Sequence, residues 1–229
     1  MSKQIIILGG MGPQASLRLH ELLLQKSRKF HNGSPGAYPA ILHASMQVPD
    51  FIATPKNVAK ALAVIQQSCA ALPLESAGAI GMACNTAHML LPELPLQREN
   101  FVSMIEAVVD DIEKLKAKRV GLLASPHTVK TKLYEHTLQQ RNIGVIVPTE
   151  HELQMLDSII HEVIAGTNTA STKTRLSRIA RQLEIRGADV ILLGCTELPL
   201  VGVRTHLPVV DSLSSLADAM LRQNNRSAV

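Results

Sequence analysis

Two of the three cysteines in the chain stand in nearly the same setting, and that setting suits acid–base chemistry. Cys84 lies in the stretch MACNTAH and Cys195 in LGCTELP, each after an apolar run and before small polar residues. A thiol in such a turn, at the start of a helix, can have its pKa lowered toward neutrality, where it exchanges protons well. Two such thiols on opposite sides of one carbon would remove a proton from one face and deliver one to the other. We expect both to be catalytic and the third, Cys69, to pack within a helix.

The residues that follow the two cysteines are polar and could contact a substrate. Asn85, Thr86 and Thr196 offer amide and hydroxyl groups that could hold a ligand carboxylate or the thiolate. Glu197 comes directly after Thr196 and has three interpretations: it orients the thiol, it binds a substrate amine, or it is solvated.

A metal site is the competing use of the same residues. Cys84, His88 four positions later and Cys195 would supply three ligands. No CxxC pair accompanies them, and His88 fits the first turn of the following helix. The sequence therefore favours acid–base chemistry over a metal centre.

A glycine turn follows the first apolar run. The stretch GGMGPQA (9–15) fits the dinucleotide fingerprint, but the next expected strand ends in HASM, without the acidic residue that would bind ribose. We therefore expect the backbone N–H groups around Gly10 and Met11 to bind a small anion such as a carboxylate. The turn SPHT (125–128) takes the matching place in the second half, where Ser125 and Thr128 either cap a helix or contact the ligand.

Short apolar runs alternate with segments of helical periodicity along the whole chain, which predicts an α/β fold with mainly parallel sheets. The expected strands are Ile5–Leu8, Ala40–Ala44, Ala79–Ala83, Val102–Ile105, Arg119–Ala124, Gly144–Val147, Val190–Gly194 and Leu207–Val210. The expected helices are Gln14–Lys29, Asn57–Leu72, Glu106–Lys116, Val129–Gln140, Glu150–Ala165, Ser171–Arg186 and Leu213–Arg222.

The two halves of the chain repeat one layout of strand, turn, later strand and cysteine. This repetition predicts two pseudo-symmetric domains, residues 1–100 plus 207–229 and residues 101–206, each a mostly parallel sheet flanked by helices. Ligands of such sheets bind beyond the carboxyl ends of the strands. We expect the active site in a cleft between the two domains.

Composition narrows the class of protein and its partners. With 46% apolar and 18% charged residues the chain is expected to be globular, and no apolar run is long enough to cross a bilayer. The N-terminal MSKQIIILGG is interpreted as a strand and not as a signal peptide, which predicts a cytoplasmic protein. A net charge of +4 with 2% aromatic residues makes nucleic acid an unfavoured partner, and three cysteines do not make a disulfide framework.

Three stretches together, IILGGMGPQAS, ACNTAH and GCTELP, resemble the cofactor-independent aspartate/glutamate racemase family, and its aspartate racemase branch most closely. The resemblance covers nearly the whole chain. It implies two similar α/β domains, a homodimer, an amino-acid substrate, and no pyridoxal phosphate or metal. It also implies that Cys84 and Cys195 are the acid and base, and that Asn85, Thr86 and Thr196 hold the α-carboxylate and amine of the substrate.

The chain departs from the resemblance where the substrate side chain would bind. Aspartate-specific relatives typically carry an arginine after the segment similar to QVPD (47–50), and here Phe51 follows. Ile164 likewise stands where relatives often have a basic residue. Arginine can pair with a substrate carboxylate and phenylalanine cannot. A neutral or bulkier substrate side chain near Phe51 is therefore an alternative to aspartate or glutamate.

Two other functions use the same residues. One cysteine could attack covalently, as in related cis–trans isomerases of unsaturated dicarboxylates. Alternatively, the protein could bind an amino acid without catalysis. Intact cysteines at both positions count against the binding protein, and mass spectrometry of trapped protein would distinguish the isomerase, because racemisation leaves no adduct.

Overall fold

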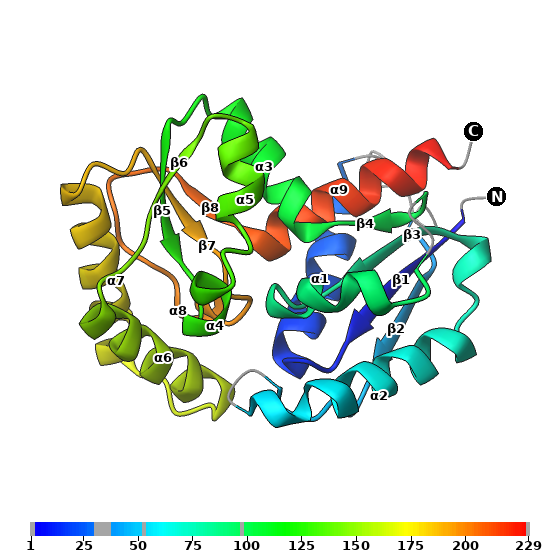
Figure 1. Ribbon diagram of the computed structural model, residues 1–229. Coiled ribbons are helices and arrows are strands. Elements are labelled where there is room, and N and C mark those ends of the chain that lie inside the picture. Colours follow the sequence, from blue (N-terminus) through cyan, green and yellow to red (C-terminus); the bar gives the residue numbers. More distant parts are fainter. Residues whose placement is uncertain (1–2, 30–37, 52–53, 97–98, 228–229) are drawn as a thin grey trace. The chain divides into compact units, whose positions relative to one another are not determined.

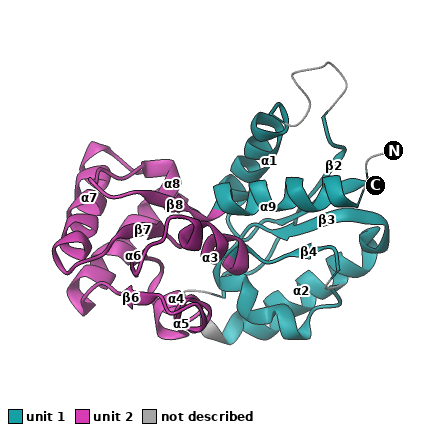
Figure 2. Ribbon diagram, turned by 90° about the horizontal axis from the view of Figure 1, so that it is seen from above, with its two compact units in different colours: residues 1–104, 213–229 teal, residues 105–212 magenta. Residues whose placement is uncertain are grey.

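The computed structural model describes residues 3–29, 38–51, 54–96 and 99–227 (Figure 1). The chain forms two compact units (Figure 2). Unit 1 comprises Met1–Met104 and Leu213–Val229, and unit 2 comprises Ile105–Ser212.

Unit 1 contains a four-stranded parallel sheet in the order β2-β1-β3-β4. Its strands are β1 (Gln4–Gly9), β2 (Ile41–Ser45), β3 (Ala77–Met82) and β4 (Phe101–Val102). The two central strands, β1 and β3, are the most buried, because a central strand of a parallel sheet is covered on both faces.

Helices cover both faces of this sheet. Alternate residues of β1 and β3, including Ile6 and Ile80, pack with Ile65 of α2 (Val58–Ala71) in one core cluster. On the opposite face a β-carbon at Gly81 would meet Met220 of α9. The helices α1 (Pro13–Ser27) and α9 (Ser212–Arg226) are joined by the ion pair Lys26–Asp218, whose N–O distance is 2.5 Å. Three short 3-10 helices complete the unit: η1 (Pro55–Asn57), η2 (Leu74–Ser76) and η3 (Thr86–Glu93).

Unit 2 repeats the same topology with a parallel sheet in the order β6-β5-β7-β8. Its strands are β5 (Arg119–Leu123), β6 (Gly144–Ile146), β7 (Val190–Leu193) and β8 (Val209–Asp211). Relabelled within each unit, both strand orders read 2-1-3-4.

The helices of unit 2 also lie on both faces. One core cluster joins Leu123 and Ile191 to α6 (Glu150–Ile164) and α7 (Ala170–Ile185). The opposite face is covered by residues around α5 (Glu135–Gln140). Arg141, directly after α5, pairs at 2.7 Å with Glu113 of α3 (Met104–Lys114). The short helices α4 (Pro126–Lys130) and α8 (Leu198–Val201) follow β5 and β7.

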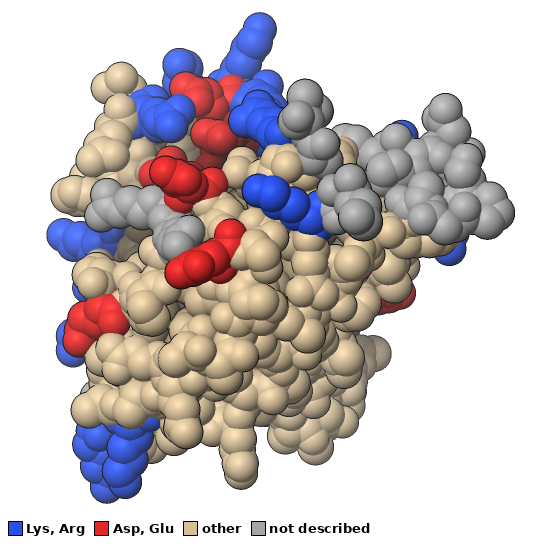
Figure 3. All heavy atoms as spheres, turned by 90° about the vertical axis from the view of Figure 1, so that its right-hand side faces the viewer, with Lys and Arg blue, Asp and Glu red and all other residues tan. Residues whose placement is uncertain are grey.

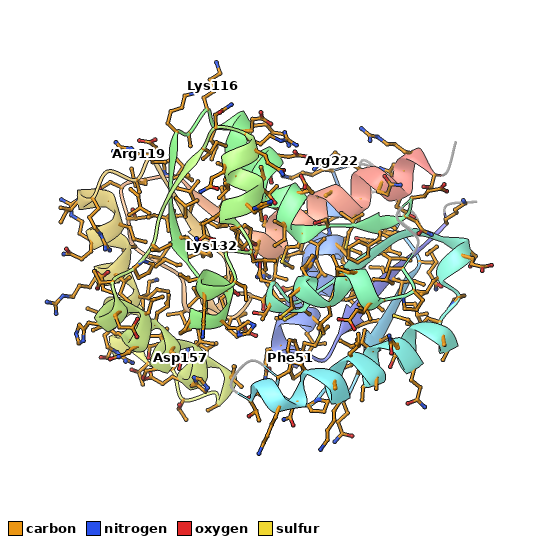
Figure 4. The ribbon with its side chains drawn as sticks, in the orientation of Figure 1. Phe51, Lys116, Arg119, Lys132, Asp157 and Arg222 are labelled. Carbon is orange, nitrogen blue, oxygen red and sulfur yellow. The ribbon has the colours of Figure 1, made fainter. Side chains whose placement is uncertain are left out.

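The α/β fold with two parallel sheets is confirmed, and one expected helix is wrong. The segment Val129–Gln140 is not continuous: α4 starts earlier, at Pro126, and ends at Lys130 before α5 begins. Lys132 has a φ of +52°, a left-handed conformation that a helix cannot contain (Figure 4). The break allows Tyr134, which is fully buried, to enter the core.

Within the described residues, no helix combines the length and the apolar composition that a membrane span requires. On the face of the molecule shown in Figure 3, basic and acidic side chains lie interspersed, and uncharged residues make up most of the surface. This face therefore carries a mixed pattern of charge.

Candidate active site

Cys84 sits at the carboxyl edge of the unit 1 sheet, two residues after the end of β3. The backbone N–H of Ala83 donates to the carbonyl of Leu8 at 2.9 Å, which extends the pairing of β3 with β1 to the residue before the cysteine. The Cys84 side chain is 3% exposed, and Asn85 and Thr86 beside it are also buried. The sheet therefore fixes the point at which the thiol-bearing turn begins.

Cys195 occupies the equivalent position in unit 2, two residues after β7. Here the backbone N–H of Gly194 donates to the carbonyl of Leu123 at 2.8 Å, the counterpart of the Ala83–Leu8 bond. Cys195 and Thr196 are buried. The repeated strand order thus places each cysteine by the same backbone device.

Glu197 contacts the thiol directly. Its Oε2 atom accepts a hydrogen bond from the Cys195 Sγ at 3.1 Å and another from the Thr196 hydroxyl at 2.9 Å. The carboxyl group is buried, with 7% of the residue exposed. This hydrogen bond is what the first of the three interpretations of Glu197, orientation of the thiol, requires.

The glycine turn lies beside the Cys84 turn, because β1 and β3 are neighbours and their carboxyl ends share one edge. Gly10 has a φ of +91°, and a β-carbon there would lie 1.9 Å from the carbonyl oxygen of Met46. Only glycine fits this close approach. Met11 packs against the core cluster that contains Cys84. α1 then begins at Pro13, so the turn is short.

Ser125 and Thr128 take the matching place after β5. The Ser125 Oγ accepts from the backbone N–H of Thr128 at 3.3 Å and donates to the Thr128 hydroxyl at 3.1 Å, and both residues are buried. Ser125 is therefore the N-cap of α4, as one of the two interpretations held. Since β5 neighbours β7, this turn and the Cys195 turn share the carboxyl edge of the unit 2 sheet.

Both pairs of turns flank the position where the strand order reverses. In the order 2-1-3-4 this switch point lies between the first and third strands, and open α/β sheets bind ligands in the crevice outside it. In unit 1 the turns of Gly10 and Cys84 stand on either side of the switch point, and in unit 2 those of Ser125 and Cys195 do so. The predicted site residues thus form two sets, one at the ligand-binding edge of each sheet.

Phe51 belongs to the apolar surroundings of the unit 1 set (Figure 4). Its side chain is 2% exposed and lies in the same core cluster as Met46 and Cys84. Ile164, the other departure, is half exposed near the end of α6. Position 51 therefore contributes an apolar side chain to the core cluster that also contains the first thiol.

His88 has a more defined role than its sequence position indicated. Its Nδ1 lies 2.8 Å from the carbonyl oxygen of Cys84, and its Nε2 accepts the backbone N–H of Met104 at 3.1 Å. Burial lowers the pKa of His88 to about 4, although hydrogen bonds with the backbone of Cys84 and Asn85 oppose the shift. Both ring nitrogens are thus occupied by the backbone and are not directed at a metal ion. Among the residues described, no group of three His, Cys, Asp or Glu side chains is placed to bind one.

Tyr134 is a residue that the sequence did not single out. A β-carbon at Gly194 would lie 3.0 Å from the Tyr134 ring, so the glycine before Cys195 allows the ring to pack against the strand end.

Cys69 behaves as expected: it is buried within α2, and burial raises the pKa of its thiol. All three cysteines are reduced thiols. The signal for His88 was its spacing of four residues from Cys84, which lets a ring reach back to that carbonyl.

Comparisons with known proteins agree with this geometry. The family model described as Asp/Glu/hydantoin racemase matches residues 8–220. The broad specificity amino-acid racemase RacX of Bacillus subtilis is 23% identical over 216 residues, which cover 92% of this chain and 93% of RacX. The aspartate racemase of Picrophilus torridus has a similar structure, with a TM-score of 0.83, 26% identity and coverage of 97% of this chain and 94% of that chain. An aspartate racemase homologue from Pyrococcus horikoshii superposes with a TM-score of 0.79 at 26% identity, over 98% of this chain and 100% of that chain.

Proposed function

The chain belongs to the Asp/Glu/hydantoin racemase family, and from this membership we propose that it interconverts the L- and D-forms of an amino acid, with Cys84 and Cys195 as the two bases. Membership makes it a racemase, an enzyme of the isomerase class. The observation that carries the two-base assignment is the equivalence of the cysteines, each two residues beyond the third strand of its sheet.

In the proposed reaction one cysteine, as a thiolate, removes the α-proton, and the other, as a thiol, protonates the resulting planar carbanion from the opposite face. The roles exchange in the reverse direction. Glu197 accepts the proton of Cys195 when that cysteine must act as the base, which the hydrogen bond between them supports. No cofactor takes part in this scheme, because both proton transfers are assigned to the two thiols.

Asn85, Thr86 and Thr196 are proposed to hold the α-carboxylate and the amine, and the backbone at Gly10 and Met11 to contribute N–H groups. Their location at switch points supports this assignment. The Ser125 hydroxyl caps α4 and bonds to the Thr128 hydroxyl, so we assign both residues to shaping the edge and to contact with substrate through the open end of the helix.

The substrate side chain is proposed to be neutral or broad in range. Phe51 lies buried in the cluster that contains Cys84, and an aromatic ring cannot pair with a side-chain carboxylate. The broad specificity in the name of RacX, whose sequence matches this one over almost its full length, supports testing a wide panel. We also propose that the protein is cytoplasmic and that it is a homodimer. Size-exclusion chromatography with light scattering will test the dimer.

The reaction is tested by incubating the protein with single enantiomers of acidic, neutral and basic amino acids in deuterium oxide. A racemase yields the opposite enantiomer with deuterium at the α-carbon, detected by chiral chromatography and mass spectrometry. Absence of α-deuterium for every amino acid would refute the proposal. A stable covalent adduct on either cysteine would instead support the cis–trans isomerase.

The two-base assignment is tested with Cys84→Ser and Cys195→Ser. The rate of racemisation by each variant should fall by at least about 10²-fold, which is the usual contribution of a general acid or base. Each should retain α-hydrogen exchange for only one enantiomer, the one served by the remaining thiol, and the two variants should retain opposite enantiomers. Cys69→Ser is the matched control and should keep full activity. Full racemisation by either active-site variant would rule the scheme out.

A further inference from the structure

His88 connects the Cys84 turn to the start of α3. The ring is 5% exposed and lies in η3, which follows the cysteine. One nitrogen contacts the Cys84 carbonyl, and the other contacts the backbone N–H of Met104, the first residue of α3. The two partners follow the neighbouring strands β3 and β4. Met104 is also the last residue of unit 1 before the chain enters unit 2.

The two backbone partners determine the form of the ring. Met104 presents an N–H, so Nε2 must be the unprotonated acceptor, and Cys84 presents a carbonyl, so Nδ1 must carry the hydrogen. Only the neutral Nδ1–H tautomer satisfies both contacts. The edge of the ring also approaches Phe101, at 6.0 Å between ring centroids, which limits its rotation.

We propose that His88 is a positioning residue for the racemase reaction, and that its neutral ring sets the orientation of the Cys84 thiol by tying the Cys84 peptide to the N-terminus of α3. This inference rests on the proposed function of Cys84 and adds a residue that does not itself touch the substrate. Proton transfer requires the thiol and the α-carbon to meet within a narrow range of distances, and a misplacement of about 1 Å can cost about 10²-fold in rate. A buried ring held at both nitrogens supplies that restraint.

Two substitutions separate the two contacts. His88→Asn can place an amide N–H near the position of Nδ1 and so keep the bond to Cys84. His88→Gln can place its carbonyl near the position of Nε2 and so keep only the bond from Met104. His161→Gln is the matched control, because His161 makes the same type of contact, from Nδ1 to the carbonyl four residues earlier at 2.8 Å, on the exposed surface of α6.

We expect His88→Gln and His88→Asn each to lower kcat by about 10- to 100-fold with KM changed by less than about threefold, because each substitution breaks one end of the tie between the Cys84 peptide and α3. His161→Gln should match the wild type. With α-deuterated substrates, the primary isotope effect of His88→Gln should rise for one enantiomer only, the one whose proton Cys84 removes. A residue that merely supports the fold would reduce the amount of folded protein and leave this isotope effect equal in both directions.

Nuclear magnetic resonance of ¹⁵N-histidine in the wild type tests the tautomer without any substitution. The Nδ1–H form at neutral pH supports the inference, and the Nε2–H form overturns it. Folded His88→Gln with wild-type kcat, or equal losses in both variants with symmetric isotope effects, also overturns it. A wild type that exchanges no α-hydrogen refutes the proposed function and with it this role. If the wild type is active, any of the three contradicting results refutes the role of His88 and leaves the proposed function standing. These results are the Nε2–H form, wild-type kcat in folded His88→Gln, and equal losses in both variants with symmetric isotope effects.

Discussion

Acidification should destabilise the folded protein through His88. Burial lowers the pKa of the folded ring from 6.5 to about 4, and the unfolded chain regains the ordinary value. The unfolded chain therefore binds a proton more tightly than the folded protein at any pH between these two values. The stability linked to His88 is complete above about pH 6.5 and is lost progressively as the pH falls toward about 4.

The size of this effect follows from the shift in pKa. Each pKa unit corresponds to about 1.4 kcal/mol, so the fall of the His88 pKa from 6.5 to about 4 corresponds to a total of about 3 to 4 kcal/mol. At about pH 4.5, where the folded ring is only beginning to take up a proton, roughly 2 to 3 kcal/mol has been lost. Because the ring is almost fully buried, solvent screening reduces this figure little. The loss is a large fraction of the stability of a typical domain.

Urea unfolding followed by circular dichroism, at about pH 7.5 and about pH 4.5, measures the loss. Other groups titrate in the same range, so the quantity to compare is the difference between the wild type and His88→Gln, whose amide does not titrate. The wild type should lose roughly 2 to 3 kcal/mol more than His88→Gln between the two pH values. His161→Gln should show the pH dependence of the wild type. An equal loss in the wild type and His88→Gln would refute the reasoning.

Three further outcomes are expected. Gly10→Ala should destabilise the protein by several kcal/mol more than Gly166→Ala. Both glycines have a positive φ, but a β-carbon at Gly10 would meet a backbone atom, whereas Gly166 has open space around it. Urea unfolding of the two variants measures the difference. Glu197→Gln should lower kcat by about 10- to 100-fold with little change in the melting temperature, and should affect α-hydrogen exchange of the enantiomer deprotonated by Cys195 more than that of the other. Cys69 should react with iodoacetamide far more slowly than a small-molecule thiol, since burial raises the pKa of its thiol; a rate equal to that of the small thiol, measured by mass spectrometry, would contradict the assignment.

The strands and most helices could be predicted because their signals are local. Apolar runs such as IIIL mark β1, and Gly10 marks the turn that follows it. The start of α4 was also available in the sequence, because Ser125 before Pro126 is a favourable N-cap followed by proline in the first turn. The break at Lys132 was not, since lysine carries no preference for a positive φ and the fully buried Tyr134 is what the break accommodates.

The candidate site likewise contains residues that the sequence could predict and a contact that it could not. Cys84, Cys195 and the contact of Glu197 lie within short sequence motifs, so their types and spacing indicated the chemistry. The bond from Met104 to His88 joins residues 16 positions apart, and it depends on β3 and β4 being neighbours in the sheet. Sequence periodicity does not specify which strands pair, so this contact required the structure.

The backbone bonds that precede the two cysteines, Ala83 to Leu8 and Gly194 to Leu123, each close within a single unit. Each unit therefore carries its own backbone support for one thiol. After the duplication that this repeat suggests, either copy could accumulate changes around its reactive group without disturbing the other. The buried carboxylate beside one sulfur and the buried imidazole behind the other are what such independent divergence would leave: a near-symmetric frame whose two reactive groups are tuned by different means.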